Sequence, residues 1–452
     1  MSWACHTKPG GSLRERVMLC NSSLFLTELH GNWGGRPTAV GGGQAFGSVQ
    51  FIATGYIALL KDECAMTDSR DHFPITLGVE EEMFLVDPQS RDLLADPDGG
   101  IFETCGNACG PHKVVREFFR CQIETNTRVC SSVAEVRTAL RDTRRIVIDA
   151  AARYGAAVMG SSTHPFALWQ TQKVSPSERY QRFLANFQDN VRHFVVGGMH
   201  VHAGFGDPDT RILVMTALRR YLPLLHALST SSPFSGGRET GFKSYRLSLV
   251  GALPRTGMPN PLYSRADYDR MMAAYRRMDF IRDGSELWWD IRPSHAFPTI
   301  ELRICDVCTR IEDGVAIVAL YACLIRWLMR QARMGKLPAE PFTELIEEDR
   351  WLAQRYGVFA ALGRQSCEGG RMECLPILEE LQGQLAQDAR ALACEAELGH
   401  ALAMAREGTC ADRQLDLYRQ RRQEGDSHQE ALRQVVDLLL TRTREQVVED
   451  SL

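Results

Sequence analysis

Acidic, basic and imidazole side chains stand at alternate positions in three apolar segments of this 452-residue sequence. The pairs that are two positions apart are Glu80 and Glu82, His200 and His202, and Glu301 and Arg303. Residues at that spacing project from the same face of a β-strand. If these strands share one sheet, apolar side chains cover one of its faces, and the carboxylates and imidazoles gather on the other.

A fourth candidate strand, residues 120–127, directs Glu124 away from the apolar Ile123. Carboxylates gathered this closely repel one another, and they ionise together only when cations lie among them. Oxygen-rich sites with an imidazole suit Mg²⁺ or Mn²⁺ better than zinc, and such cations commonly hold substrate phosphates. The chain has no GxxxxGK[ST] loop. The pattern therefore predicts nucleotide phosphate chemistry on a metal-binding sheet face, without a P-loop.

Basic side chains that could bind an anionic substrate occur nearby in the sequence. Arg238, Lys243 and Arg246 lie in a polar, glycine-containing segment, and Arg292 follows Trp288-Trp289-Asp290. Arginine can hold a carboxylate or a phosphate with two parallel hydrogen bonds, although each of these residues alone also fits a structural role. Glu81 points to the apolar face of its strand, so we expect it to have a basic partner and do not assign it to the site.

The elements that must position these residues follow from hydrophobic periodicity. Strands are predicted at residues 75–86, 120–127, 194–205 and 298–306. Helices are predicted at 132–155, 213–229, 263–282 and 314–334, and the chain from Phe342 onward is expected to be helical, with amphipathic stretches at 375–406 and 428–448. Strands and helices mix without a regular βαβ alternation, which favours an α+β fold with an antiparallel sheet.

Composition excludes several classes of protein. Charged residues make up 24% and hydrophobic residues 44%, and the formal net charge of −4 favours neither nucleic acid nor an anionic membrane surface as a partner. The longest apolar run, residues 315–325, is well short of the roughly 20 residues that span a bilayer. The 14 cysteines are scattered, with a single CxxC at Cys305 and Cys308, and we interpret them as free thiols in a reducing cytoplasm.

Residues 1–72 differ from the rest, because they are glycine-containing and weakly periodic. They predict a poorly structured N-terminal extension, and an open alternative is that translation begins at Met66. Residues 73–452 are expected to form one catalytic domain that includes the helical C-terminal region.

The sequence resembles the glutamate–cysteine ligase type 2 family, also described as carboxylate–amine ligases. Five segments between residues 73 and 335 carry the resemblance in order: TLGVEEEMFLVD (76–87), GSSTHPFALW (160–169), GGMHVHAGF (197–205), SSPFSGGRETGFKSYR (231–246) and WWDIRPSHAFPTIELRICD (288–306). This family is similar in fold to the catalytic domain of glutamine synthetase. The resemblance implies an antiparallel sheet with the active site on one face and helices on the other.

The resemblance also implies roles for individual residues. Two or three Mg²⁺ ions would be held by Glu80, Glu82, Glu124, His200 and Glu301. His202 would lie near the nucleotide phosphates, and Arg303 would bind the substrate or the transferred phosphoryl group. Arg246 would bind the nucleotide, and Arg292 would take part in catalysis. Both roles are assigned only because these residues stand within matching motifs. Ser235-Gly236-Gly237-Arg238 departs from many relatives, which have a bulkier and less basic segment there, and this departure could alter the amine that is accepted.

The implied reaction is ATP-dependent ligation. The γ-carboxylate of glutamate takes the γ-phosphate of ATP, and an amine, with cysteine as the leading choice, displaces phosphate to give γ-glutamylcysteine. The partners would be small molecules, and assembly into a homo-oligomer is left open. Three alternatives remain: a metal-dependent amidohydrolase-type enzyme, a guanidino phosphotransferase of similar fold, and a binding protein that keeps the fold without catalysis.

Overall fold

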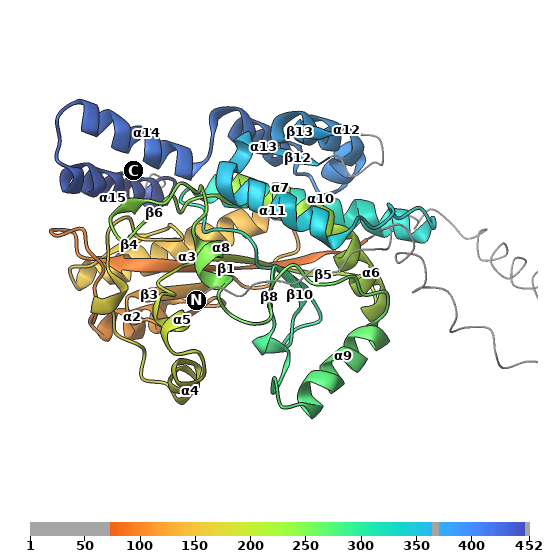
Figure 1. The fold of residues 1–452 in the computed structure, drawn as a ribbon, viewed down its shortest axis with the longest axis horizontal. Coiled ribbons are helices and arrows are strands. Elements are labelled where there is room, and N and C mark those ends of the chain that lie inside the picture. Colours follow the sequence, from red (N-terminus) through yellow and green to blue (C-terminus); the bar gives the residue numbers. More distant parts are fainter. Residues whose placement is uncertain (1–72, 364–369, 448–452) are drawn as a thin grey trace, which may run out of the picture. The chain divides into compact units, whose positions relative to one another are not determined.

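The computed structural model describes residues 73–363 and 370–447 (Figure 1). The predicted N-terminal extension, residues 1–72, lies outside the described residues. Among the described residues, no helix combines the length and apolar character needed to cross a bilayer.

A seven-stranded sheet organises the described chain, in the order β10-β11-β5-β1-β3-β2, with β4 also paired to β1. Every pair in it is antiparallel. Its strands are β1 (Thr76–Val86), β2 (Lys113–Arg116), β3 (Gln122–Asn126), β4 (Ala157–Met159), β5 (Met199–Gly204), β10 (Ile291–Pro293) and β11 (Ile300–Leu302). The expected α+β fold with an antiparallel sheet is therefore confirmed.

Three small pairs of strands lie outside this sheet. They are β6 (Phe234–Ser235) with β7 (Arg238–Glu239), β8 (Thr256–Gly257) with β9 (Trp288–Trp289), and β12 (Ala361–Gly363) with β13 (Arg371–Glu373). The pairing of β8 with β9 is parallel. The pair β12–β13 interrupts the region after Phe342, so the prediction that this region is helical throughout is wrong at that point.

The described α-helices are α2 (Gly100–Ala108), α3 (Val133–Arg153), α4 (Glu178–Phe187), α5 (Asp189–Arg192), α6 (Pro208–Leu218), α7 (Leu222–Ser229), α8 (Arg246–Val250), α9 (Arg265–Arg277), α10 (Ile311–Arg333), α11 (Thr343–Tyr356), α12 (Cys374–Ala391), α13 (Glu395–Glu407), α14 (Cys410–Gln423) and α15 (His428–Arg444). In Figure 1, α10–α13 lie above the sheet, whereas α4 and α9 lie below it.

Local chemistry explains where these helices begin. Ser132 caps α3, since its hydroxyl accepts a hydrogen bond of 3.1 Å from the backbone N–H of Glu135. The expected helix at 213–229 is two helices. The first starts earlier, at Pro208 behind the capping Asp207, and the second starts with Pro223 in its first turn, where the missing N–H costs nothing.

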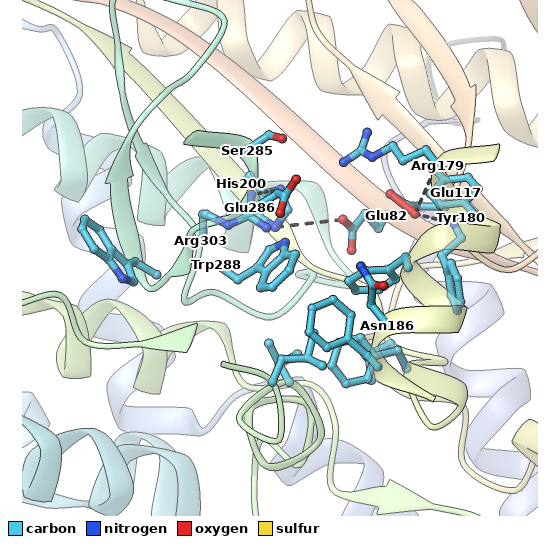
Figure 2. A pocket seen from close by; sticks show the side chains of 18 of the residues that line it. Glu82, Glu117, Arg179, Tyr180, Asn186, His200, Ser285, Glu286, Trp288 and Arg303 are labelled. Atoms are coloured by element: carbon cyan, nitrogen blue, oxygen red, sulfur yellow. Dashed lines mark hydrogen bonds and ion pairs between the residues drawn. The ribbon is translucent and has the colours of Figure 1, made fainter. Parts of the chain in front are cut away.

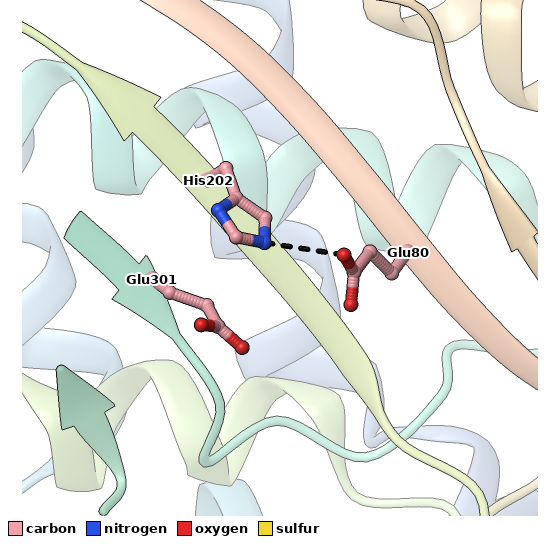
Figure 3. Close-up of side chains that lie close together, drawn as sticks. All are labelled: Glu80, His202 and Glu301. Atoms are coloured by element: carbon pink, nitrogen blue, oxygen red, sulfur yellow. Dashed lines mark ion pairs between the residues drawn. The ribbon is translucent and has the colours of Figure 1, made fainter. Parts of the chain in front are cut away.

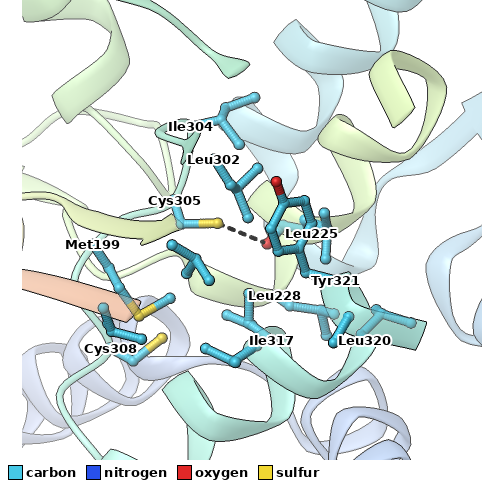
Figure 4. Close-up of a cluster of buried hydrophobic side chains, with 14 of the residues drawn as sticks. Met199, Leu225, Leu228, Leu302, Ile304, Cys305, Cys308, Ile317, Leu320 and Tyr321 are labelled. Carbon is cyan, nitrogen blue, oxygen red and sulfur yellow. Dashed lines mark hydrogen bonds between the residues drawn. The ribbon is translucent and has the colours of Figure 1, made fainter. Parts of the chain in front are cut away.

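The apolar face of the sheet packs on helices to form the main core. Leu77, Val79 and Met83 of β1 alternate with the polar positions and are buried. Against this face lies α10, which is buried on nearly all sides. Figure 4 shows part of this core, in which Cys305 and Cys308 lie among apolar side chains as free thiols. The single CxxC is therefore part of the core packing.

A buried ion pair crosses from β1 to α3. The Arg144 guanidinium donates to both carboxylate oxygens of Glu81, at 2.9 and 2.6 Å. It also donates to the backbone carbonyls of Cys308 and Thr309, each at 2.6 Å. Both side chains are inaccessible to solvent. Glu81 thus has the basic partner that its place on the apolar face predicted.

The last two helices close the other side of β1, beyond the carboxylates. Side chains of α15 pack in a second cluster with Phe84 and Val86. Thr443 accepts a hydrogen bond of 2.9 Å from the backbone N–H of Gly160, and Asp437 pairs with Arg91 at 3.0 Å. The C-terminal end of the described chain therefore completes the environment of the first strand.

Candidate active site

The registers of four adjacent strands bring the chemistry-bearing residues onto one face. Glu80 of β1 is opposite His200 of β5, and His202 is opposite Glu301 of β11. On the other side of β1, Glu82 is opposite Glu124 of β3. Since side chains alternate along each strand, all of these residues project to the polar face.

Glu80, His202 and Glu301 form the first candidate metal group, in which one ligand atom from each residue lies within 4.8 Å of the others (Figure 3). Nε2 of His202 is 3.3 Å from Glu80 Oε1, and its Nδ1 is 2.9 Å from the hydroxyl of Thr299. Two carboxylates and one imidazole suit a hard divalent cation that keeps some of its waters. The hydroxyl of Thr299 orients the imidazole from behind, as partners of ligating histidines commonly do.

Glu82, Glu117 and Glu124 form the second group, with the same 4.8 Å limit between their oxygens. Burial, followed by the negative charge of Glu117, raises the pKa of Glu82 to about 8. Burial and the three neighbouring carboxylates raise the pKa of Glu124 well above its ordinary value. Three carboxylates this close repel one another when they are ionised. Binding of a cation would relieve this repulsion, and without a cation some of the carboxyl groups stay protonated.

Sequence reasoning missed Glu117. The residue follows β2, directly before Phe118, and the β2–β3 hairpin folds it back beside Glu124. A usable signal was the short stretch Lys113–Arg116, which is separated from Gln122–Asn126 by a length typical of a hairpin loop.

His200 lies between the two groups. Its Nδ1 is 3.2 Å from Glu80 Oε2, and its Nε2 is 4.0 Å from Glu82 Oε1. Burial and the charge of Arg303 lower the pKa of His200 to about 4, so the ring is neutral near pH 7 and has a lone pair to offer. The family resemblance implies that His200 is one of the metal ligands and that His202 lies near the nucleotide phosphates. In the structure His202 lies with Glu80 and Glu301, and His200 lies within 4.0 Å of a carboxylate of each group.

Two arginines hold Glu301. Arg292 binds its carboxylate through two hydrogen bonds, of 2.9 and 3.2 Å, and also donates to the carbonyls of Ser285 and Leu287. Arg303 contacts the same carboxylate from the other side. Although burial opposes ionisation, Arg303 and Arg292 hold the pKa of Glu301 well below its ordinary range. Glu301 is therefore a charged, fixed carboxylate.

Arg246 supports the backbone beneath Arg303. Its guanidinium donates to the carbonyls of Arg303 and Ile304 at 3.2 and 3.3 Å. Asp306 organises the segment that carries Arg246, because it accepts hydrogen bonds from Ser231, Ser232 and Ser244. In this arrangement Arg246 positions Arg303 and also reaches the cavity described below.

Two glycines before β5 permit close approach to the site. A Cβ on Gly197 would stand 2.3 Å from the backbone oxygen of Glu82, and one on Gly198 would stand 2.4 Å from the guanidinium of Arg246. The first contact is with backbone, which cannot move aside cheaply. The absence of side chains at Gly197 and Gly198 therefore lets Glu82 and Arg246 reach their places.

Replacing Gly197 with alanine is expected to lower the free energy of unfolding by about 1–3 kcal/mol, because β1 and the segment before β5 must separate. Urea denaturation measures this. Gly106→Ala is the matched control, since a Cβ there meets nothing within 4 Å and alanine favours its helix. Equal losses in both variants would contradict the close-packing argument.

A cavity of about 500 Å³ opens beside the second metal group (Figure 2). Its polar lining includes residues of the site itself: Glu82, Glu117, His200, Arg246 and Arg303. Helix α4 and the segment 282–290 supply much of the rest. The size is that of an ordinary ligand pocket, and the polar groups converge at one end, as in sites that orient a substrate.

Comparison with known proteins identifies relatives over most of the chain. The model of glutamate-cysteine ligase family 2 matches residues 76–437. A protein of Rhodospirillum rubrum assigned as a glutamate–cysteine ligase 2 is 43% identical over 374 residues, which are 81% of this chain and 95% of that protein. A protein of Jannaschia sp. with the same assignment is 41% identical over 379 residues, or 83% and 98% of the two chains.

Solved structures share the fold at much lower identity. A glutamate–cysteine ligase from Francisella tularensis, determined in complex with AMP, has a TM-score of 0.60 at 12% identity and covers 83% of this chain and 90% of its own. A bifunctional glutathione synthetase from Pasteurella multocida has a TM-score of 0.58 at 15% identity, with 88% of this chain and 55% of that chain covered.

Proposed function

The chain belongs to glutamate–cysteine ligase family 2, and from that premise we propose that it joins the γ-carboxylate of glutamate to an amine, with γ-glutamyl phosphate as the intermediate. The enzyme is an ATP-dependent ligase that forms a carbon–nitrogen bond. Cysteine is the first amine to test, since the relatives bear its name. The observation that supports the proposal best is that Glu82 and Glu117 of the second metal group line a substrate-sized cavity together with His200 and Arg303.

The residues present fit two divalent cations. Glu80, His202 and Glu301 would hold one, and Glu82, Glu117 and Glu124 the other, with His200 in reach of both groups. Bound Mg²⁺, or Mn²⁺ in its place, would offset the charge on the phosphate oxygens during transfer.

In the first step, a γ-carboxylate oxygen of glutamate attacks the γ-phosphorus of ATP. The bond between that phosphorus and the β,γ-bridging oxygen breaks, and ADP leaves. Arg303 lines the cavity beside His200, so its guanidinium can bind the substrate carboxylate or the phosphoryl group in transfer. Arg292 and Arg246 keep Arg303 and Glu301 in place through the contacts described above.

In the second step, the amine nitrogen attacks the γ-carbonyl carbon of the acyl phosphate. The carbon–oxygen bond to phosphate breaks, and the departing phosphate takes up the proton that the amine loses. No serine or cysteine nucleophile is needed, because the phosphate already activates the carbonyl. The substrates are small molecules, and we place the reaction in the cytoplasm, where ATP and free amino acids occur together.

The test separates the intermediate from the choice of amine. The purified protein is incubated with Mg²⁺, ATP and glutamate, and hydroxylamine is added to trap the acyl phosphate as γ-glutamyl hydroxamate. Hydroxamate that requires ATP, glutamate and Mg²⁺ together is the expected result. Phosphate release is then measured with amino acids added singly, and with cysteine the expected product is γ-glutamylcysteine.

Two results would count against the proposal. Cleavage of simple amides without ATP consumption would indicate a hydrolase. Transfer of phosphate to a guanidine, with no free phosphate and no hydroxamate, would indicate a phosphotransferase. Chelation of Mg²⁺ with EDTA serves as the control and should abolish hydroxamate formation.

A further inference from the structure

One wall of the cavity is aromatic. Phe183 and Phe187 of α4 face Trp288, with ring centroids 5.5 and 5.6 Å apart, and Phe118 meets Phe183 at 5.5 Å and Tyr180 at 5.6 Å. Most of these contacts are edge-to-face, the arrangement that aromatic rings favour. The rings therefore form a preorganised surface rather than a loose collection of side chains.

This wall packs against the second core cluster on one side and lines the cavity on the other. None of the residues of α4 is fully buried, although Phe183 and Phe187 are one turn apart and share the face that lines the cavity. Trp288 is likewise only half-buried. Apolar surface that is left open inside a cavity and rimmed by polar groups is typical of a ligand site.

The charges around the cavity are mixed. Glu82 and Glu117 lie at the end next to the metal groups, where a bound cation would take up their charge. Arg179 extends from α4 over this end and is exposed to the cavity, while the neighbouring Arg282 is paired with Glu286 at 3.3 Å (Figure 2). With these carboxylates bound to a cation, the exposed guanidinium of Arg179 remains as a charged group that can pair with the carboxylate of an amino acid.

We infer that this cavity binds the acceptor amine and that the acceptor is an aromatic amino acid in preference to cysteine. The inference rests on the proposed ligase function and names its second substrate. The aromatic ring would lie against Phe183, Phe187 and Trp288, and the carboxylate would pair with Arg179. The side chain of cysteine, one methylene and a thiol, would leave these three rings largely uncovered.

The experiment compares kcat/KM for L-phenylalanine, L-tyrosine, L-tryptophan and L-cysteine, each with Mg²⁺, ATP and glutamate, and identifies the γ-glutamyl products by mass spectrometry. At least one aromatic amino acid is expected to exceed cysteine by about tenfold or more. In Phe183→Ala, the ratio of kcat/KM for that amino acid to kcat/KM for hydroxylamine should fall by about tenfold. Phe183→Leu, which keeps apolar volume, should lose less.

Phe359→Ala is the matched control, because Phe359 is an exposed aromatic residue outside the cavity and its loss should leave the ratio unchanged. The inference is overturned if cysteine is the best acceptor while hydroxamate still forms, which leaves the ligase function standing. It is also overturned if Phe183→Ala raises the KM for ATP instead, since the cavity would then hold the nucleobase. Failure to form hydroxamate with any substrate set would remove the proposed function, and the inference with it.

Discussion

Glu301→Gln is expected to lower the turnover of the ligase by roughly 10²–10³-fold, the loss usually seen when one preorganised charge is removed from an active site. The carboxylate of Glu301 belongs to the first metal group and is held between Arg292 and Arg303. An amide has the same shape but no charge, so it would bind a cation weakly and leave two buried guanidinium groups without their partner. Hydroxamate formation under saturating Mg²⁺, ATP and glutamate measures the effect.

A matched control is available on the far side of the core. Glu312 also accepts two hydrogen bonds from one arginine, Arg137, at 2.9 and 3.0 Å, but it lies outside the site. Glu312→Gln should therefore retain turnover. Thermal unfolding of both variants shows whether the folded state survives. Near-wild-type turnover in Glu301→Gln would remove this residue from the catalytic set.

Arg144→Ala is expected to lower the free energy of unfolding by about 3–5 kcal/mol, since it leaves the charge of Glu81 buried without a partner. The carbonyls of Cys308 and Thr309 would lose their donor as well. Urea denaturation, followed by fluorescence, measures the change. Arg144→Lys keeps the charge but cannot make the same set of contacts, so an intermediate loss is expected.

The comparison variant is Arg265→Ala, which breaks an exposed pair with Asp269 of 2.8 Å. An exposed pair of this kind contributes about 0–1 kcal/mol, so little change is expected. The double change Glu81→Leu with Arg144→Met should recover much of the loss, because no charge then remains buried. If Arg144→Ala costs no more than Arg265→Ala, the buried pair is not what holds α3 to the sheet.

The sheet and its polar face could be predicted because alternation is a local property. Glu80 and Glu82 had to project together once residues 75–86 were identified as a strand, and the same held for His200 and His202. The family resemblance, which is confirmed, implied that these strands form one antiparallel sheet with the site on one face. Neither the alternation of side chains nor the family resemblance determined which imidazole lies next to which carboxylate, since that depends on the twist and register of three strands.

Other parts of the site have weak sequence signals and depend mainly on tertiary structure. Glu117 enters the second metal group through a hairpin whose first strand is four residues long, too short for a clear periodic signal. Helix α4, which supplies the aromatic wall, was not predicted, although its apolar residues share one face and pack in part against the second core cluster. Arg246 and Arg292 were assigned from their motifs, but spacing could not identify their partners, which are backbone carbonyls for Arg246 and the carboxylate of Glu301 for Arg292.

The contact between Thr443 and Gly160, 283 residues apart, has a consequence for how the chain is made. Ribosomes add about 5–20 residues per second, so β1 emerges some tens of seconds before α15 is complete. Until then Phe84 and Val86 lack the apolar side chains that cover them in the finished protein. A product cut short before residue 428 would leave these apolar side chains exposed to solvent, which favours aggregation.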